Sequence, residues 1–193
     1  MSARIAVLIS GRGSNMSAIA RSTQVGLLHG RCSIVSVVSN RVDAPGLAVA
    51  EELGLETGVV PSAGLDTDAY GRRLLEALRP LAPDVVILAG FMRYISAEMV
   101  AEYPDRILNI HPADTRAYQG PDGYGWAYER RLPTTWITVH RVDAGIDTGA
   151  IVAQAEVDLR GAKSLDEVVA RGLIVEHELY PEALAQILAE EVT

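Results

Sequence analysis

The chain has 193 residues, 49% of them hydrophobic, and a formal net charge of −8 at pH 7. This length suits one domain, residues 1–193, and the negative charge argues against a surface that binds nucleic acid or an anionic membrane. The single cysteine excludes an intramolecular disulfide. The sequence has no apolar run of about 18 residues and no signal-peptide core at its start, which predicts a cytoplasmic chain outside any membrane.

Strands and helices alternate over the first hundred residues. Apolar runs predict strands at residues 4–10, 33–39, 56–61 and 84–90. Helices are expected at 14–28, from an N-cap at Asp43 to Gly54, from an N-cap at Asp66 to Leu81, and at 96–102. This alternation predicts a Rossmann-like, doubly wound, mostly parallel sheet with right-handed crossovers.

The second half of the chain departs from this rhythm. Residues 112–125 are rich in Gly, Pro, Asp and Tyr, and their length predicts an active-site loop before a short helix at 124–130. Two strands, at 134–142 and 150–159, are followed by a capping box at 164–167 and a long helix to Glu190, which we expect to bend or break at Pro181. The expected fold class is α/β, with an antiparallel C-terminal strand pair and a long C-terminal helix.

The apolar run at residues 106–112 holds two polar side chains, Asn109 and His111. Because they are two residues apart, a strand would point both to the same face, at the sheet edge where open α/β folds bind ligands. An amide donor beside a titratable imidazole can hold an oxyanion and manage a proton. The alternative is that both side chains only satisfy loop backbone groups.

A glycine-rich segment, Gly11-Arg12-Gly13-Ser14-Asn15, follows the first strand and opens a helix. Its backbone N–H groups and the helix N-terminus suit a phosphate. The dinucleotide fingerprint would need glycine at the position of Met16, and no acidic residue ends the second strand. A phosphomonoester cradle is favoured over an NADP site that uses Arg41 and over a plain tight turn.

Residues 143–149 join the last two strands and exceed an ordinary hairpin turn. Asp147, flanked by glycines, could face His111 as a proton relay, although both aspartates of this loop could instead bond only their own backbone. A metal site formed by His111, His140 and Asp147 is disfavoured because no pair of them has a recognised metal-ligand spacing. We expect no metal.

Six stretches carry a family resemblance. In chain order they are residues 9–15 (ISGRGSN), 38–47 (Val38 to Arg41, Asp43-Ala44 and Gly46-Leu47), 84–95 (DVVILAGFMRYI), 108–112 (LNIHP), 143–149 and 176–181 (EHELYP). Together and in this order they resemble the phosphoribosylglycinamide formyltransferase family, over nearly the whole chain. The resemblance implies the formyltransferase fold, with a phosphate-binding half (1–103) and a catalytic, folate-binding half (104–193).

The resemblance implies transfer of a formyl group from 10-formyltetrahydrofolate, the co-substrate, to the amine of glycinamide ribonucleotide in purine synthesis. The family's catalytic Asn, His and Asp fall on Asn109, His111 and Asp147. Asn109 and His111 would hydrogen-bond the tetrahedral oxyanion. Asp147, through water, would orient His111 and accept the amine proton.

Binding residues are implied in the same way. The acceptor would be held by Gly11, Arg12, Gly13, Ser14, Asn15 and Glu176. The pterin pocket would consist of Phe91, Met92, Arg93, Tyr94, Ile95, Val142, Asp143 and Ala144. Without the resemblance, Met92 and Ile95 could simply pack in the core, and Glu176 could lie on a solvated helix face. We expect a monomer or a homodimer.

The loop after His111 departs from the family pattern. Relatives usually continue with Ser-Leu-Leu-Pro, whereas this chain has Ala113-Asp114-Thr115-Arg116; Asp122 stands where a histidine is usual, and Leu173 where a polar ribose contact often occurs. A different amine, such as an amino-sugar nucleotide that contacts Asp114 or Asp122, therefore stays open as the acceptor. A non-catalytic folate- or nucleotide-binding module is a further alternative. A 10-formyltetrahydrofolate hydrolase is another, but the N-terminal regulatory domain that such hydrolases usually carry has no room before Arg4.

Overall fold

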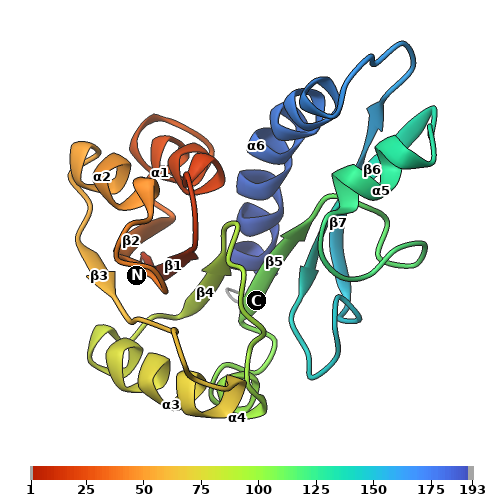
Figure 1. Ribbon diagram of the computed structural model, residues 1–193. Helices are drawn as coiled ribbons and strands as arrows, with labels where there is room; N and C mark the ends of the chain where they lie inside the picture. Colours follow the sequence, from red (N-terminus) through yellow and green to blue (C-terminus); the bar gives the residue numbers. More distant parts are fainter. Residues whose placement is uncertain (1, 191–193) are drawn as a thin grey trace.

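One sheet of seven strands organises the computed structural model, which describes residues 2–190. The strands are β1 (Ala3–Ile9), β2 (Cys32–Ser39), β3 (Thr57–Val59), β4 (Val85–Leu88), β5 (Ile107–His111), β6 (Thr134–Arg141) and β7 (Ile151–Asp158). Their order in the sheet is β3-β2-β1-β4-β5-β6-β7 (Figure 1). The pairs from β3 to β5 are parallel, and β5–β6 and β6–β7 are antiparallel. The predicted fold class is confirmed.

Helices cover both faces of this sheet. They are α1 (Ser14–Val25), α2 (Pro45–Glu52), α3 (Thr67–Leu78), α4 (Ala97–Glu102), α5 (Gly123–Glu129) and α6 (Leu165–Glu190), with a 3-10 turn η1 at Arg79–Leu81. Figure 1 shows α1, α2 and α6 on one side of the sheet and α3 and α4 on the other. Of the helices in residues 2–190, none combines the length and apolar character that a membrane crossing requires.

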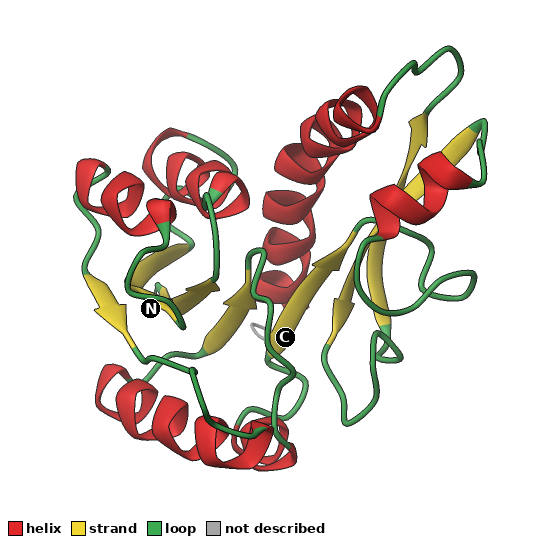
Figure 2. Ribbon diagram, viewed as in Figure 1, coloured by secondary structure: helices red, strands yellow, loops and turns green. Residues whose placement is uncertain are grey.

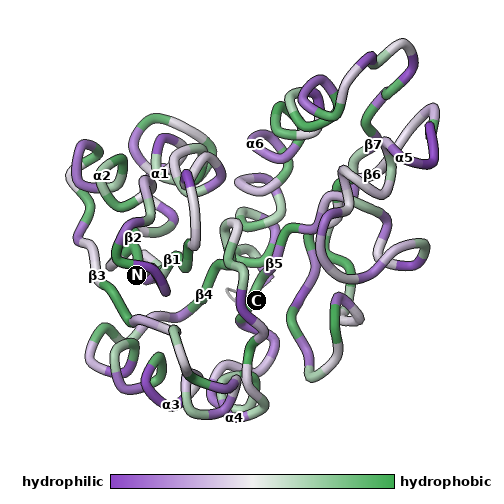
Figure 3. The backbone as a smooth tube through the Cα atoms, in the orientation of Figure 1, coloured by the Kyte–Doolittle hydropathy of each residue, from purple (hydrophilic) through white to green (hydrophobic). Residues whose placement is uncertain are grey.

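Two hydrophobic cores result from the alternation of side chains along the central strands. Ile5 and Val7 of β1 pack with α1 and α6, whereas Ala6 and Leu8 pack with α3 and α4. Both sets are fully buried, which explains why β1 is continuously apolar from Ile5 to Ile9 rather than alternating. Figure 3 shows the same hydrophobic character along β4, the neighbour of β1.

Three details differ from the expectations. Helix α1 ends at Val25, because Gly26 is extended and Leu28 turns into the core. Asp43 does not cap α2: the N-cap is Ala44, and Asp43 pairs with Arg41 at 2.9 Å.

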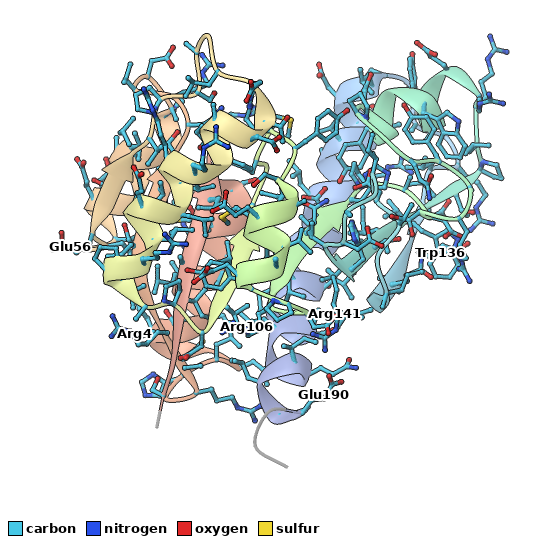
Figure 4. The ribbon with its side chains drawn as sticks, turned by 90° about the horizontal axis from the view of Figure 1, so that it is seen from below. Arg4, Glu56, Arg106, Trp136, Arg141 and Glu190 are labelled. Atoms are coloured by element: carbon cyan, nitrogen blue, oxygen red, sulfur yellow. The ribbon has the colours of Figure 1, made fainter. Side chains whose placement is uncertain are left out.

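The third detail is Pro181, which does not interrupt α6. Tertiary packing accounts for this, because the side chains around the proline are buried against the sheet. An ion pair also joins the C-terminal end of α6 to the sheet: Nη2 of Arg141 in β6 lies 3.0 Å from Oε2 of Glu190 (Figure 4).

The expected cap of α3 is present and gives a first prediction. The Asp66 carboxylate accepts a hydrogen bond from the Ala69 N–H at 2.7 Å. We expect Asp66→Ala to lower the free energy of unfolding by about 1 kcal/mol, because one helical N–H loses its partner. Asp43→Ala is the control, since no cap is lost there; urea unfolding that gives equal losses for both variants would contradict this account.

Candidate active site

A cleft of about 1050 Å³ lies where β1, β4 and β5 end. Its walls include the first turn of α1, one face of α6 and the two long connections, 112–122 and 142–150, that Figure 2 shows on the β6–β7 side of the sheet. All of the site residues predicted from the sequence line this cleft. They are Gly11, Arg12, Gly13, Ser14, Asn15, Phe91, Met92, Arg93, Tyr94, Ile95, Asn109, His111, Val142, Asp143, Ala144, Asp147 and Glu176.

Asn109, His111 and Asp147 meet in the cleft. The two β5 residues both face Asp147: Asn109 Nδ2 lies 3.4 Å from Oδ1, and His111 Nδ1 lies 3.6 Å from Oδ2. His111 is buried. Asn109 and His111 therefore lie side by side in the cleft and both face Asp147; their catalytic roles stay a prediction.

The 142–150 connection is shaped to present Asp147. The backbone of Asp147 is left-handed, with φ of 51°, and the Gly120 N–H donates to Oδ2 at 2.9 Å. Gly149 permits the fold-back, because an added Cβ would lie 1.9 Å from the Arg141 carbonyl oxygen. Asp143, in contrast, bonds its own loop through the Gly145 N–H and the Thr148 hydroxyl.

His140 is a fourth member, which the sequence suggested only as a disfavoured metal ligand. The β5–β6 register pairs it with Asn109. Its Nδ1 donates to the Arg141 carbonyl at 2.8 Å, so in the neutral ring Nε2 accepts from Asn109 Nδ2 at 3.3 Å. His140 therefore fixes the orientation of the Asn109 amide.

Burial and neighbouring groups determine the protonation states of His111 and Asp147. Burial lowers the pKa of His111, against the charge of Asp147 and the hydrogen bond to the Tyr118 carbonyl. For Asp147, burial raises the pKa. At the acid pH where Asp147 titrates, a hydrogen bond from the protonated His140 ring, the Gly120 N–H and the charges of both protonated histidines outweigh burial, so the net shift is downward. At neutral pH a neutral imidazole thus lies beside an ionised carboxylate, an arrangement suited to taking up a proton.

The atypical loop closes over His111. The Tyr118 carbonyl accepts from His111 Nε2 at 3.1 Å, and the Tyr118 ring lies between His111 and Trp126, stacked on the latter at 4.9 Å. Asp114 pairs with Arg116 and does not line the cleft. Asp122 lines it and also caps α5, by accepting from the Gly125 N–H.

The glycine-rich segment has the geometry of an anion site. Gly13 is the N-cap of α1 in the left-handed region, with φ of 73°, and no side chain caps this helix. Met16 is fully buried below it. The start of α1, with its backbone N–H groups, therefore borders the cleft.

Glu176 lies deep in the opposite wall. It is buried, so the alternative of a solvated helix face is wrong. Its oxygens accept from Asn15 Nδ2 at 2.5 Å and from the Tyr124 hydroxyl. Sequence reasoning missed Tyr124, because nothing in the local pattern indicates a partner 52 residues away.

The predicted pterin wall is partly core and partly surface. Phe91 is buried and stacks on Tyr70 at 6.2 Å, and Ile95 packs against the same core. Met92 is 74% exposed and Tyr94 60%, so core packing is the wrong explanation for Met92.

Comparison with known proteins agrees with this geometry. The formyl transferase family model matches residues 3–184. The chain is 38% identical to the phosphoribosylglycinamide formyltransferase of Escherichia coli over 92% of its length and 83% of that enzyme. It is 36% identical to the trifunctional purine biosynthetic protein adenosine-3 of Drosophila melanogaster, of which it spans only 14%.

Solved structures show the same relationship. Glycinamide ribonucleotide transformylase 1 from Symbiobacterium toebii superposes with a TM-score of 0.92 at 35% identity, over 98% of this chain and 89% of that one. For phosphoribosylglycinamide formyltransferase from Brucella melitensis the TM-score is 0.89 at 37% identity, over 98% and 97%. This chain therefore belongs to the phosphoribosylglycinamide formyltransferase family and is a formyltransferase enzyme.

Proposed function

We propose that this enzyme transfers the formyl group of 10-formyltetrahydrofolate to the amine of glycinamide ribonucleotide. The observation that carries the proposal is the group formed by Asn109, His111 and Asp147, which lies in one cleft with the glycine-rich segment. Relatives whose names state this acceptor share more than a third of the sequence with the chain. The acceptor's phosphate would lie at residues 11–15.

The cleft residues fit the two substrates. Exposed apolar side chains, Met92, Tyr94 and Ile146, line the cleft and offer contact to a flat bicyclic ring. The folate supplies the formyl group. Backbone N–H groups at the start of α1 offer donors to a phosphate.

In the proposed mechanism, the oxygen on which negative charge develops replaces two hydrogen-bond acceptors. Asn109 turns one amide N–H to it from Asp147, and His111 turns its Nε2–H to it from the Tyr118 carbonyl. Such donors act strongly because they are already oriented in an enclosed site. Asp147 accepts, through a water molecule, the proton that the attacking amine must lose. The depressed pKa of Asp147 keeps its carboxylate available for this step at neutral pH. The tetrahedral intermediate then collapses: the bond between the formyl carbon and the folate nitrogen breaks, and the proton passes back through water to that nitrogen, so that tetrahydrofolate leaves.

The test is a steady-state assay with both substrates, in which tetrahydrofolate release is followed by absorbance. We expect turnover that depends on glycinamide ribonucleotide, and a kcat about 10²- to 10³-fold lower in Asn109→Ala, because one oxyanion donor is lost. Gln24→Ala, which removes an exposed amide on α1, is the control and keeps the full rate. Release of tetrahydrofolate at the same rate without the acceptor would instead identify a hydrolase.

A further inference from the structure

Three elements meet at one end of the cleft, around a carboxylate that is almost fully enclosed. Glu176 of α6 is 5% exposed, and Asn15 of α1 and Tyr124 of α5 each donate to one of its oxygens. Burial raises the pKa of Glu176, and these two donors oppose the shift. The ionised form of Glu176 therefore depends on both donors.

Gly172 makes room for Tyr124. It lies one turn before Glu176 on α6, and a Cβ added there would be 2.2 Å from Tyr124 Cε1 and 2.3 Å from its hydroxyl oxygen. Glycine destabilises a helix interior relative to alanine, so its presence within α6 calls for a packing reason. The tyrosine ring supplies that reason, and any larger residue at position 172 would displace it.

The wall of the cleft next to Glu176 is apolar, so only a few polar atoms there can form hydrogen bonds to a ligand. Val169 and Leu173 of α6 also line the cleft. Asn15 Oδ1 is buried and has no hydrogen-bond partner within residues 2–190. The polar group that this end of the cleft offers to a ligand is thus the Glu176 carboxylate, which as an acceptor matches hydroxyl donors.

We propose that Tyr124 is a positioning residue for acceptor recognition, which holds the Glu176 carboxylate against the sugar hydroxyls of the acceptor and so selects acceptors that carry them. This inference rests on the proposed transfer to a phosphorylated sugar amine. Tyr124 acts through Glu176 and takes no part in the chemical step, so its loss changes acceptor KM rather than kcat.

Kinetics with glycinamide ribonucleotide and with an analogue that lacks its ribose 2′-hydroxyl test the proposal. We expect Tyr124→Phe to raise acceptor KM about tenfold with kcat nearly unchanged, because a hydrogen bond to a charged group is lost. Discrimination against the deoxy analogue falls by a similar factor. Tyr128→Phe removes an exposed hydroxyl from the same helix and is the matched control, with no change in either quantity.

A pH profile separates this role from a merely structural one. The polar groups near Glu176 are Tyr124 of α5, Asn15 of α1, and His177 and Tyr180 of α6. Loss of the Tyr124 donor raises the pKa of Glu176 further, so the carboxylate takes up its proton at a higher pH as the solution is acidified. The rise of acceptor KM on the acid side therefore begins at a higher pH in Tyr124→Phe.

Gly172→Ala is an independent variant, which we expect to raise acceptor KM by expelling the tyrosine ring. If wild-type enzyme formylates glycinamide ribonucleotide while Tyr124→Phe keeps the same KM, discrimination and pH profile, the inference is wrong and the proposed function stands. If wild-type enzyme does not formylate it, the proposed function fails. In that case, calorimetric titration of the wild type and of Tyr124→Phe with glycinamide ribonucleotide tests the inference. Weaker binding by Tyr124→Phe than by the wild type supports the role of Tyr124. Equal binding by the two proteins, or no binding by either, overturns it.

Discussion

Asp147→Asn should lower kcat for formyl transfer by about 10²- to 10⁴-fold, the range that general acid–base groups contribute. The amide keeps the size of the carboxylate and can still accept the Gly120 N–H bond, but it cannot take up the amine proton. Stopped-flow or steady-state absorbance measures the loss. Circular dichroism and urea unfolding check that the fold is kept.

The pH dependence adds a second readout to this variant. The charge of Asp147 raises the pKa of His111, against the larger effect of burial. Its removal lowers that pKa further, so the acid limb of kcat/KM that reports a neutral His111 moves to lower pH. Asp158→Asn, at the surface end of β7, is the isosteric control with unchanged rate. A kcat within about twofold of wild type in Asp147→Asn would rule out the proposed relay.

Tyr180→Ala should lower the free energy of unfolding by about 3–5 kcal/mol, the cost of emptying a large aromatic site. Tyr180 is fully buried, and its hydroxyl shares its single proton between the carbonyl oxygens of Leu88 at 3.0 Å and Leu108 at 2.9 Å. It therefore joins α6 to β4 and β5, directly beside Asn109. Urea unfolding followed by circular dichroism measures the change.

Tyr180→Phe divides this effect into its parts. The ring stays, so only the hydrogen bonds to the two strand carbonyls are lost, and we expect a loss of about 1–3 kcal/mol. Tyr94→Phe, at an exposed hydroxyl, should leave stability unchanged. A Tyr180→Phe protein as stable as wild type would mean that these two bonds are replaced by water or are energetically neutral.

Local sequence patterns predicted most of the secondary structure. The apolar runs of β1 and β4, the Asp66 cap and the strand position of Asn109 and His111 all follow from side-chain periodicity and capping chemistry, which act over a few residues. Wrong expectations arose where packing overrides local preference. Helix α1 ends early because Leu28 turns into the core, and α6 continues through Pro181 because its flanking residues are buried against the sheet.

The sequence by itself determined the α/β fold, the family and the group formed by Asn109, His111 and Asp147, because ordered motifs and strand periodicity carry that information. Only the tertiary structure decided what surrounds the group. The β5–β6 register brings His140 to Asn109, 31 residues away, and the packing of α5 on α6 brings Tyr124 to Glu176, 52 residues away. Such contacts depend on how whole elements pack together, since neither partner has a sequence neighbour that indicates the other.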